Sequence, residues 1–229
     1  MDVVHPMIRR MQQEAKEDPD GFWAKEADTL PWFRKWDQVF EWTPPTFRWF
    51  GGARTNLAWN CVDHHVARGR GGHAALIGVN EMGERRVYTY GQLQREVERL
   101  ARALRGMGID KGDRVTVYMP TMPEAIILML AIVRIGAIHS VVFAGFGSGA
   151  LGERIRLSGS KAVFAADVTW RKGKTVNLKE IVDKALTESG ETVERVVVLP
   201  RAPGGCAMTE GRDITWDEFV AGGEGHDGS

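Results

Sequence analysis

The feature that most constrains the fold of this 229-residue chain is a regular alternation of strand-like and helix-like segments. Short β-branched or apolar runs predict strands at 114–119, 137–143, 161–166 and 193–199, and helical patterns predict helices at 125–135, 150–157 and 176–186. Strands that alternate with helices form a parallel sheet with helices on both faces. The sequence therefore predicts an α/β fold, in which ligands bind beyond the carboxyl ends of the strands.

Two shorter patterns precede or interrupt this alternation. Extended runs at 74–79 and 86–90, joined by a turn at 81–84, predict a β-hairpin. Thr-x-x-Gln at 89–92 and Thr-x-x-Glu at 121–124 both match the capping box that begins a helix. We therefore expect one helix to start after the hairpin and another to start near Pro123.

The first 60 residues have a different composition. Six of the eight tryptophans lie between Trp23 and Trp59, among prolines and phenylalanines, which predicts an irregular aromatic layer. A mostly polar helix is expected over 1–27, interrupted near 18–21. These patterns predict a Trp/Pro-rich helical cap at 1–60 and an α/β part at 61–229. The Gly-rich, polar tail at 221–229 is expected to be a linker or a cut end.

Composition excludes several classes of function. The 30 Lys and Arg balance the 30 Asp and Glu, so no bulk charge attracts nucleic acid or an anionic membrane. No apolar run has the length of a membrane span. The two cysteines are too few for a disulfide framework or a zinc site, and they favour a reducing, cytoplasmic location. Adjacent Asp63, His64 and His65 favour a structural or surface role over metal binding.

The turn after the second predicted strand matches a relaxed dinucleotide-binding pattern. Gly145, Gly147 and Ala150 fit G-x-G-x-x-A, and Asp167 ends the next strand about 20 residues on. This pattern places a pyrophosphate at a helix N-terminus and a ribose on the carboxylate, so NAD binding is one interpretation. The other is that the glycines only permit a tight turn.

The loop after the third predicted strand is cationic. Its Gly-Lys-Thr ending at 173–175 resembles a phosphate-binding P-loop, but the first glycine of that motif would fall at Val168. Arg171 and Lys174 nevertheless suit a phosphate monoester, through a guanidinium fork and a point charge. The alternative is a solvated charged loop.

Several longer segments carry a resemblance to a known family. They are Trp32-Phe33-x-x-Trp36-Asp37, Lys111-Gly112-Asp113-Arg114-Val115, Tyr118-Met119-Pro120-x-x-Pro123-Glu124-Ala125 and the run from Arg134 to Phe143. With these segments the chain resembles the N-terminal part of short-chain acyl-CoA synthetases, the acetyl-CoA and propionyl-CoA branch of the AMP-forming, adenylate-forming enzymes. The resemblance extends from about Gly21 to about Leu186.

The resemblance implies a partial N-terminal domain of an adenylate-forming enzyme. The family's phosphate loop, adenine and Mg²⁺ motifs, acyl pocket and mobile C-terminal domain would all lie downstream. A whole enzyme of this kind converts acetate or propionate, ATP and CoA into acyl-CoA, AMP and pyrophosphate through an acyl-adenylate. We expect no catalytic residue and no metal site within residues 1–229, and no ligase activity from them alone.

The resemblance also assigns the two loops. By position, Phe143, Ala144 and Gly145 would lie against the adenosine of CoA, and Arg171 and Lys174 would meet its 3′-phosphate. The partners implied are small molecules rather than nucleic acid or membrane. Two alternatives stay open at this point, which are an NAD-binding Rossmann-type domain and a non-catalytic truncated homologue. The acid used and the oligomeric state are not determined by the sequence.

Overall fold

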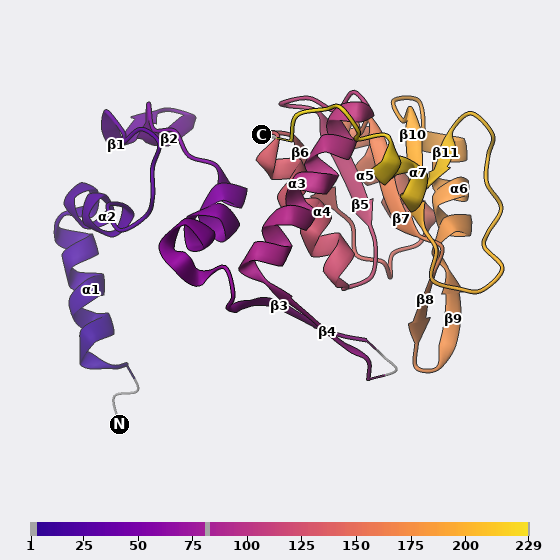
Figure 1. Ribbon diagram of the computed structural model, residues 1–229. Helices are drawn as coiled ribbons and strands as arrows, with labels where there is room; N and C mark the ends of the chain where they lie inside the picture. The colour runs from indigo at the N-terminus through magenta and orange to yellow at the C-terminus, as the bar shows by residue number, and fades with distance from the viewer. Residues whose placement is uncertain (1–3, 81–82, 229) are drawn as a thin grey trace. The chain divides into compact units, whose positions relative to one another are not determined.

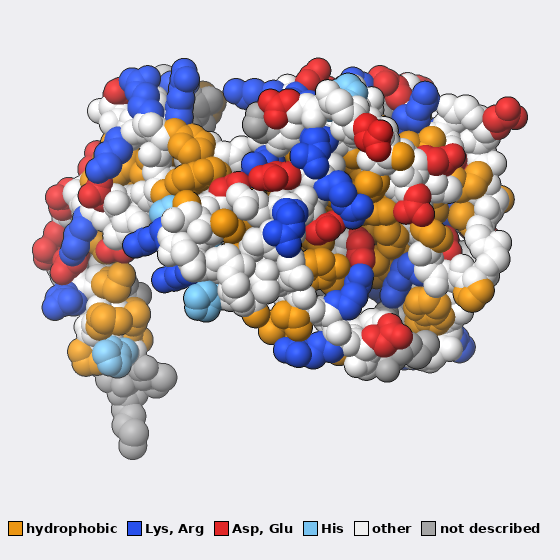
Figure 2. All heavy atoms as spheres, in the orientation of Figure 1, with side chains coloured by type: hydrophobic (Ala, Val, Ile, Leu, Met, Phe, Trp, Pro, Cys, Tyr) orange, Lys and Arg blue, Asp and Glu red, His pale blue; other side chains and the backbone are white. Residues whose placement is uncertain are grey.

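The computed structural model describes residues 4–80 and 83–228. The chain divides into two compact units, Met1–Asn60 and Cys61–Ser229, and each is described by itself. On the face drawn in Figure 2, basic and acidic side chains are interspersed rather than gathered by sign. Within the described residues, no helix combines the length and the apolar character needed to cross a membrane.

Two helices begin the smaller unit, α1 (Pro6–Glu17) and α2 (Pro19–Ala27). Asp18 separates them, and its carboxylate accepts a hydrogen bond from the backbone N–H of Gly21 at 3.0 Å. Proline at the first position of α2 needs no hydrogen-bond acceptor, so it fits a helix start. The interruption expected near 18–21 is therefore confirmed.

An antiparallel pair of strands, β1 (Gln38–Thr43) and β2 (Thr46–Gly51), follows the helices. The Pro44–Pro45 peptide between them is cis. Trp32 and Trp36 both contact Phe50, with ring centroids 5.6 and 5.1 Å away. The sequence analysis predicted the aromatic layer but missed this ladder, in which Phe40 lies opposite Trp49 and Trp42 lies opposite Phe47 on one face.

The larger unit contains an antiparallel hairpin of β3 (Ala74–Val79) and β4 (Arg85–Thr89), as predicted. Part of the expected turn at 81–84 lies outside the described residues. Two short π-helical segments, η1 (Trp59–Asp63) and η2 (Val66–Arg70), precede the hairpin along the chain. The predicted capping box is confirmed, because Thr89 and Gln92 exchange hydrogen bonds at the start of α3 (Tyr90–Gly106).

A five-stranded parallel sheet with the order β11-β10-β7-β5-β6 forms the centre of this unit (Figure 1). The strands are β5 (Arg114–Tyr118), β6 (Ile138–Val141), β7 (Ala162–Ala166), β10 (Arg195–Leu199) and β11 (Asp213–Thr215). The helices that connect or follow them are α4 (Pro123–Arg134), α5 (Ser148–Ser158), α6 (Leu178–Ser189) and α7 (Trp216–Ala221). The α/β fold with helices on both faces is thus confirmed.

Alternating residues of the central strands enter two separate cores. Val115 and Val117 of β5 pack with α3, α4 and α7 on one face. Tyr118 packs with α5 and α6 on the other. Because successive side chains of a strand point to opposite faces, an apolar strand buried on both sides supports both helix layers.

Two local predictions are wrong. Helix α4 begins after Met122 rather than at a Thr121 capping box, and Glu124 instead pairs with Arg86 of β4. The tail at 222–228 is not a free linker. A Cβ at Gly223 would lie 2.7 Å from the backbone nitrogen of Ala103, so the glycines permit the tail to pack closely on α3.

Candidate functional site

A tight turn after β6 positions the first group of predicted site residues. The N–H groups of Gly145 and Phe146 both donate to the carbonyl oxygen of Phe143, at 2.7 and 2.9 Å. Val142 remains tied to the sheet through its N–H, which donates to Val117 at 2.9 Å. The turn therefore leaves the carboxyl end of β6 at once and presents the Phe143 ring to solvent, where the residue is 62% exposed.

A second hairpin, which the sequence did not predict, carries the cationic residues. Strands β8 (Val168–Arg171) and β9 (Lys174–Asn177) are antiparallel, and Arg171 lies opposite Lys174. Lys172 and Gly173 connect them with φ angles of 47° and 76°. Two consecutive left-handed residues are typical of a tight hairpin turn, whose twist matches that of the strands. The hairpin thus brings two cationic side chains to one end of the sheet.

Arg171 packs directly on the turn after β6. Its guanidinium carbon lies 4.7 Å from the centroid of the Phe143 ring, a cation–π contact. A Cβ built on Gly145 would lie 2.4 Å from a guanidinium nitrogen of Arg171, so only glycine allows this approach. Within the part of the chain that the structure describes, no carboxylate lies within 4.0 Å of the nitrogen atoms of Arg171 or Lys174.

The structure therefore brings four of the five predicted site residues to one place. Phe143, Gly145 and Arg171 are in mutual contact, and Lys174 is the strand neighbour of Arg171. Ala144 differs from the other four because its side chain is buried in the core beside α5. Only its backbone could reach a ligand, and the role of all five residues stays a prediction.

Asp167 does not have the environment that an NAD site requires. It is 2% exposed, and its carboxylate accepts backbone N–H groups from Val168 at 2.7 Å, Arg201 at 2.8 Å and Ala202 at 3.1 Å. These bonds fix the segments after β7 and β10 to each other. A carboxylate committed in this way is not available to a ribose hydroxyl, so this structure does not support the dinucleotide-binding interpretation.

Asp63 has a structural role, as the sequence suggested. Its carboxylate accepts hydrogen bonds from Arg134 at 2.7 Å and from Gln94 at 2.8 Å. Among the residues that the structure describes, no three His, Cys, Asp or Glu side chains are grouped so that they could hold a metal ion.

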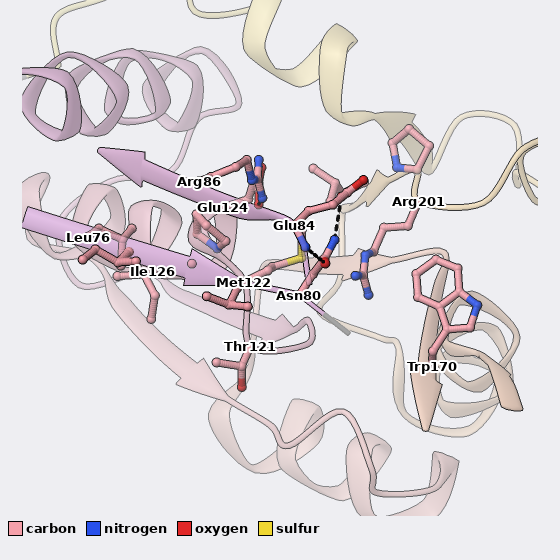
Figure 3. A pocket seen from close by; sticks show the side chains of 16 residues that line it. Leu76, Asn80, Glu84, Arg86, Thr121, Met122, Glu124, Ile126, Trp170 and Arg201 are labelled. Carbon is pink, nitrogen blue, oxygen red and sulfur yellow. Dashed lines mark hydrogen bonds and ion pairs between the residues drawn. The ribbon is translucent and has the colours of Figure 1, made fainter. Parts of the chain in front are cut away.

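A cleft of about 640 Å³ lies at the carboxyl ends of β5 and β10, and the sequence analysis missed it. Figure 3 shows Trp170 and Arg201 on one side and Leu76, Asn80 and Arg86 on the other. The guanidinium carbon of Arg201 is 4.7 Å from the Trp170 ring centroid. The expectation that ligands bind beyond the carboxyl ends of the strands, including those that end at Met119 and Leu199, pointed to this region. The β3–β4 hairpin, which forms one wall of the cleft, was not predictable there, because its position depends on a tertiary contact that no local pattern encodes.

Two family models match this chain. Residues 63–217 match the model described as AMP-binding enzyme, and residues 8–61 match the model described as the acetyl-coenzyme A synthetase N-terminus. The first match covers more than half of the chain, and its residues include the turn after β6. This chain belongs to the AMP-binding enzyme family.

Curated relatives are acyl-CoA synthetases. The chain is 42% identical to the acetyl-coenzyme A synthetase of Chlorobaculum tepidum, over 92% of this chain and 32% of the relative. It is 46% identical to the 3-hydroxypropionyl-coenzyme A synthetase of Metallosphaera sedula, over 89% of this chain and 31% of the relative. The chain thus spans about a third of the length of the curated relatives it matches.

A solved structure has the same fold. The acetoacetyl-CoA synthetase from Streptomyces lividans superposes with a TM-score of 0.81 at 25% identity. The match covers 96% of this chain and 33% of that chain.

Proposed function

We propose that this chain forms the CoA-nucleotide side of an AMP-forming short-chain acyl-CoA synthetase. The observation that carries the proposal is the Arg171 guanidinium, which is held against Phe143 beside Gly145 and has no carboxylate partner among the residues that the structure describes. A guanidinium fork that faces solvent beside an aromatic ring suits a phosphate monoester attached to a nucleoside. Lys174, opposite Arg171 in the hairpin, adds a second positive charge. The 3′-phosphate of CoA has this chemistry.

The proposed reaction has two steps. A carboxylate oxygen of the acid attacks the α-phosphorus of ATP, and pyrophosphate leaves to give an acyl-adenylate. The thiol of CoA then attacks the acyl carbon and releases its proton to water, and AMP leaves with the electrons of the broken C–O bond. We assign ATP, Mg²⁺ and the acyl group to parts of the protein outside residues 1–229, and no residue here is proposed as catalytic.

The substrate is proposed to be acetate or propionate. The names of the relatives, which include acetyl-, 3-hydroxypropionyl- and acetoacetyl-CoA synthetases, support a short acid without selecting one. Within this proposal, residues 1–60 form an N-terminal cap and residues 61–229 form the first α/β part of the large domain. We further propose a cytoplasmic protein whose partners are small molecules, not nucleic acid or membrane.

A comparison of CoA with dephospho-CoA tests the site. Replacing Arg171 with Ala removes a charge-assisted contact of about 1.5–3 kcal/mol, so the Kd for CoA should rise roughly 10- to 150-fold. Dephospho-CoA should bind the unsubstituted protein about as weakly as CoA binds the variant. The sample is the whole gene product at its natural length, studied by isothermal titration calorimetry.

A matched control separates this effect from a general loss of positive charge. Arg156 is an exposed arginine on α5, and Arg156→Ala removes the same charge away from the turn. The Kd for CoA should stay unchanged in this variant. Equal affinities of the unsubstituted protein for CoA and dephospho-CoA would overturn the assignment of Arg171 to the 3′-phosphate.

A further inference from the structure

Tyr118 connects the core to the candidate site through its hydroxyl group. It is the last residue of β5, it is 0% exposed, and its ring packs in the core beside α5 and α6. Its hydroxyl donates to the carbonyl oxygen of Phe146 at 2.6 Å. Phe146 lies in the turn that carries Phe143 and Gly145.

The hydroxyl is not needed to fill the core. Ala165, which pairs with Tyr118 in the sheet, is an apolar residue of the same core, and phenylalanine would occupy nearly the same volume as tyrosine. A buried tyrosine hydroxyl without a partner would be unfavourable, so its hydrogen bond identifies what the group does. Here the partner is the turn, not another element of the core.

Phe146 connects this hydrogen bond to Arg171. Its ring contacts the Phe143 ring edge-on, with centroids 5.8 Å apart. The Arg171 guanidinium lies over that Phe143 ring. The guanidinium carbon of Arg154 on α5 also lies 4.8 Å from the Phe146 ring centroid. Tyr118 therefore holds the backbone of Phe146, and Arg154 holds its ring.

We propose that Tyr118 and Arg154 are positioning residues for CoA: they fix Phe146 and so hold Phe143 where it orients Arg171 toward the 3′-phosphate. This inference rests on the proposed function. Neither residue is proposed to touch the ligand. Their effect is preorganisation, because a turn that is already fixed loses less conformational entropy when it binds.

The decisive variant is Tyr118→Phe, which removes only the hydroxyl. Losing one neutral hydrogen bond that holds the turn should raise the Kd for CoA about threefold to tenfold. The Kd for dephospho-CoA should change less, so the ratio of the two affinities should fall. In steady-state kinetics of the whole gene product, the KM for CoA should rise while the KM values for ATP and the carboxylate stay unchanged.

Thr116→Val is the matched control for a purely structural role. Thr116 lies on the same strand and the same face, is 0% exposed, and its hydroxyl shares a 2.7 Å hydrogen bond with Ser160. This variant also removes one buried hydroxyl, so its urea midpoint should fall by an amount similar to that of Tyr118→Phe. Its affinity for CoA should stay at the unsubstituted value, since Ser160 is not part of the turn.

Arg154→Gln provides a second line of evidence. It removes the guanidinium over Phe146 and keeps much of the side chain's length, so it should weaken CoA binding in the same direction as Tyr118→Phe. The affinity ratio for CoA and dephospho-CoA should again fall. An unchanged ratio in both variants overturns the positioning role.

The outcomes distinguish this inference from the proposed function. Selective loss of CoA affinity in Tyr118→Phe, with Thr116→Val unchanged, supports the inference. Equal loss in both variants overturns it, because the effect then follows stability. If Arg171→Ala weakens CoA binding but Tyr118→Phe does not, the inference alone fails. If Arg171→Ala binds CoA as the unsubstituted protein does, the proposed site fails and the inference with it.

Discussion

Gly145 shows how much a single absent side chain contributes to the candidate site. A Cβ at this position would lie 2.4–2.5 Å from two guanidinium nitrogens of Arg171 and from the Phe143 ring. Gly145→Ala should therefore displace the guanidinium. The Kd for CoA should rise about tenfold, a cost near 1.4 kcal/mol. Calorimetric titration of the whole gene product with CoA measures the change.

Gly149→Ala is the control for this prediction. Gly149 lies in the first turn of α5, and a Cβ there would meet nothing within 4 Å. Alanine also has the higher helix propensity, so this variant should be as stable as the unsubstituted protein or more stable by up to about 1 kcal/mol. A similar loss of CoA affinity in both variants would contradict the steric explanation.

At the scale of single residues, the sequence indicated the chemical character of the site residues better than it indicated which of them are in contact. The cationic character of Arg171 and Lys174 was visible in the sequence, and the family resemblance added Phe143 and Gly145. The contact of Arg171 with Phe143 was not predictable, because it depends on a hairpin and a turn that are 28 residues apart and meet only in the folded sheet. The sequence left a ribose-binding role open for Asp167, since no local pattern reveals that three backbone N–H groups occupy its carboxylate.

Among the elements, α3 offers a direct test of helix capping. The Thr89 hydroxyl accepts from the Gln92 N–H at 3.2 Å, and the Gln92 side chain accepts from the Thr89 N–H at 2.8 Å. Thr89→Ala should lower the free energy of unfolding by about 1 kcal/mol, because it leaves a helix N–H without this acceptor. Urea denaturation followed by circular dichroism measures the change.

The control for the capping prediction removes a threonine hydroxyl from a helix interior. Thr187 of α6 is exposed and donates to the carbonyl oxygen of Asp183 at 3.0 Å. Because that carbonyl already accepts within the helix, Thr187→Ala should leave stability unchanged or raise it slightly. A loss in Thr187→Ala as large as in Thr89→Ala would contradict a specific capping effect.

The ion pairs of Asp213 between α6 and β11 should affect the stability of the protein in acid. The Asp213 side chain is 0% exposed and pairs with Lys179 at 2.8 Å and Arg212 at 2.6 Å. Burial alone would raise the pKa of Asp213, but hydrogen bonds from Arg212 and Lys179 outweigh it and lower the pKa. Since the folded-state pKa lies below the unfolded value of about 3.9, the pair stabilises the protein above about pH 4. That stability is lost as the pH falls through the folded-state pKa.

Asp213→Asn tests this pair. Removing the charge leaves Lys179 buried beside fewer carboxylates, so the free energy of unfolding at pH 7 should fall by roughly 3 kcal/mol. The variant should also lose less stability than the unsubstituted protein between about pH 4 and lower pH. Asp217→Asn, at an exposed position of α7, is the control and should alter neither value by more than about 0.5 kcal/mol. Parallel acid dependence in Asp213→Asn and the unsubstituted protein would contradict the prediction.

The sequence predicted long elements better than short ones. Strands β5, β6, β7 and β10 and helices α4 to α6 agree with the predicted ranges to within a few residues, because each has a clear apolar pattern. The β8–β9 hairpin was missed because each strand has four residues and the second is mostly exposed. Strand β11 has three residues and is defined by its parallel pairing with β10, which is a tertiary interaction.

For the molecule as a whole, the alternation of strands and helices predicted a parallel sheet but not its order. When the five strands are numbered along the chain, they lie side by side in the order 2-1-3-4-5. The second strand, β6, is added on one side of β5 and the third, β7, on the other, so the order of addition reverses between β5 and β7. A crossover through a helix can place the next parallel strand on either side, so local patterns do not determine where this reversal occurs. The reversal matters because ligands bind at such points, beyond the carboxyl ends of the strands.

The last prediction concerns activity at the scale of the whole protein. The chain matches about a third of each relative, and the described residues provide neither a metal-holding cluster nor a group that we propose as catalytic. Residues 1–229 alone, given acetate or propionate with ATP, Mg²⁺ and CoA, should therefore release no AMP above a no-enzyme blank. The acetyl-coenzyme A synthetase of Chlorobaculum tepidum, assayed side by side, is the positive control. Carboxylate-dependent AMP release by residues 1–229 would show that the adenylating groups lie within this chain, and the division of roles proposed above would be wrong.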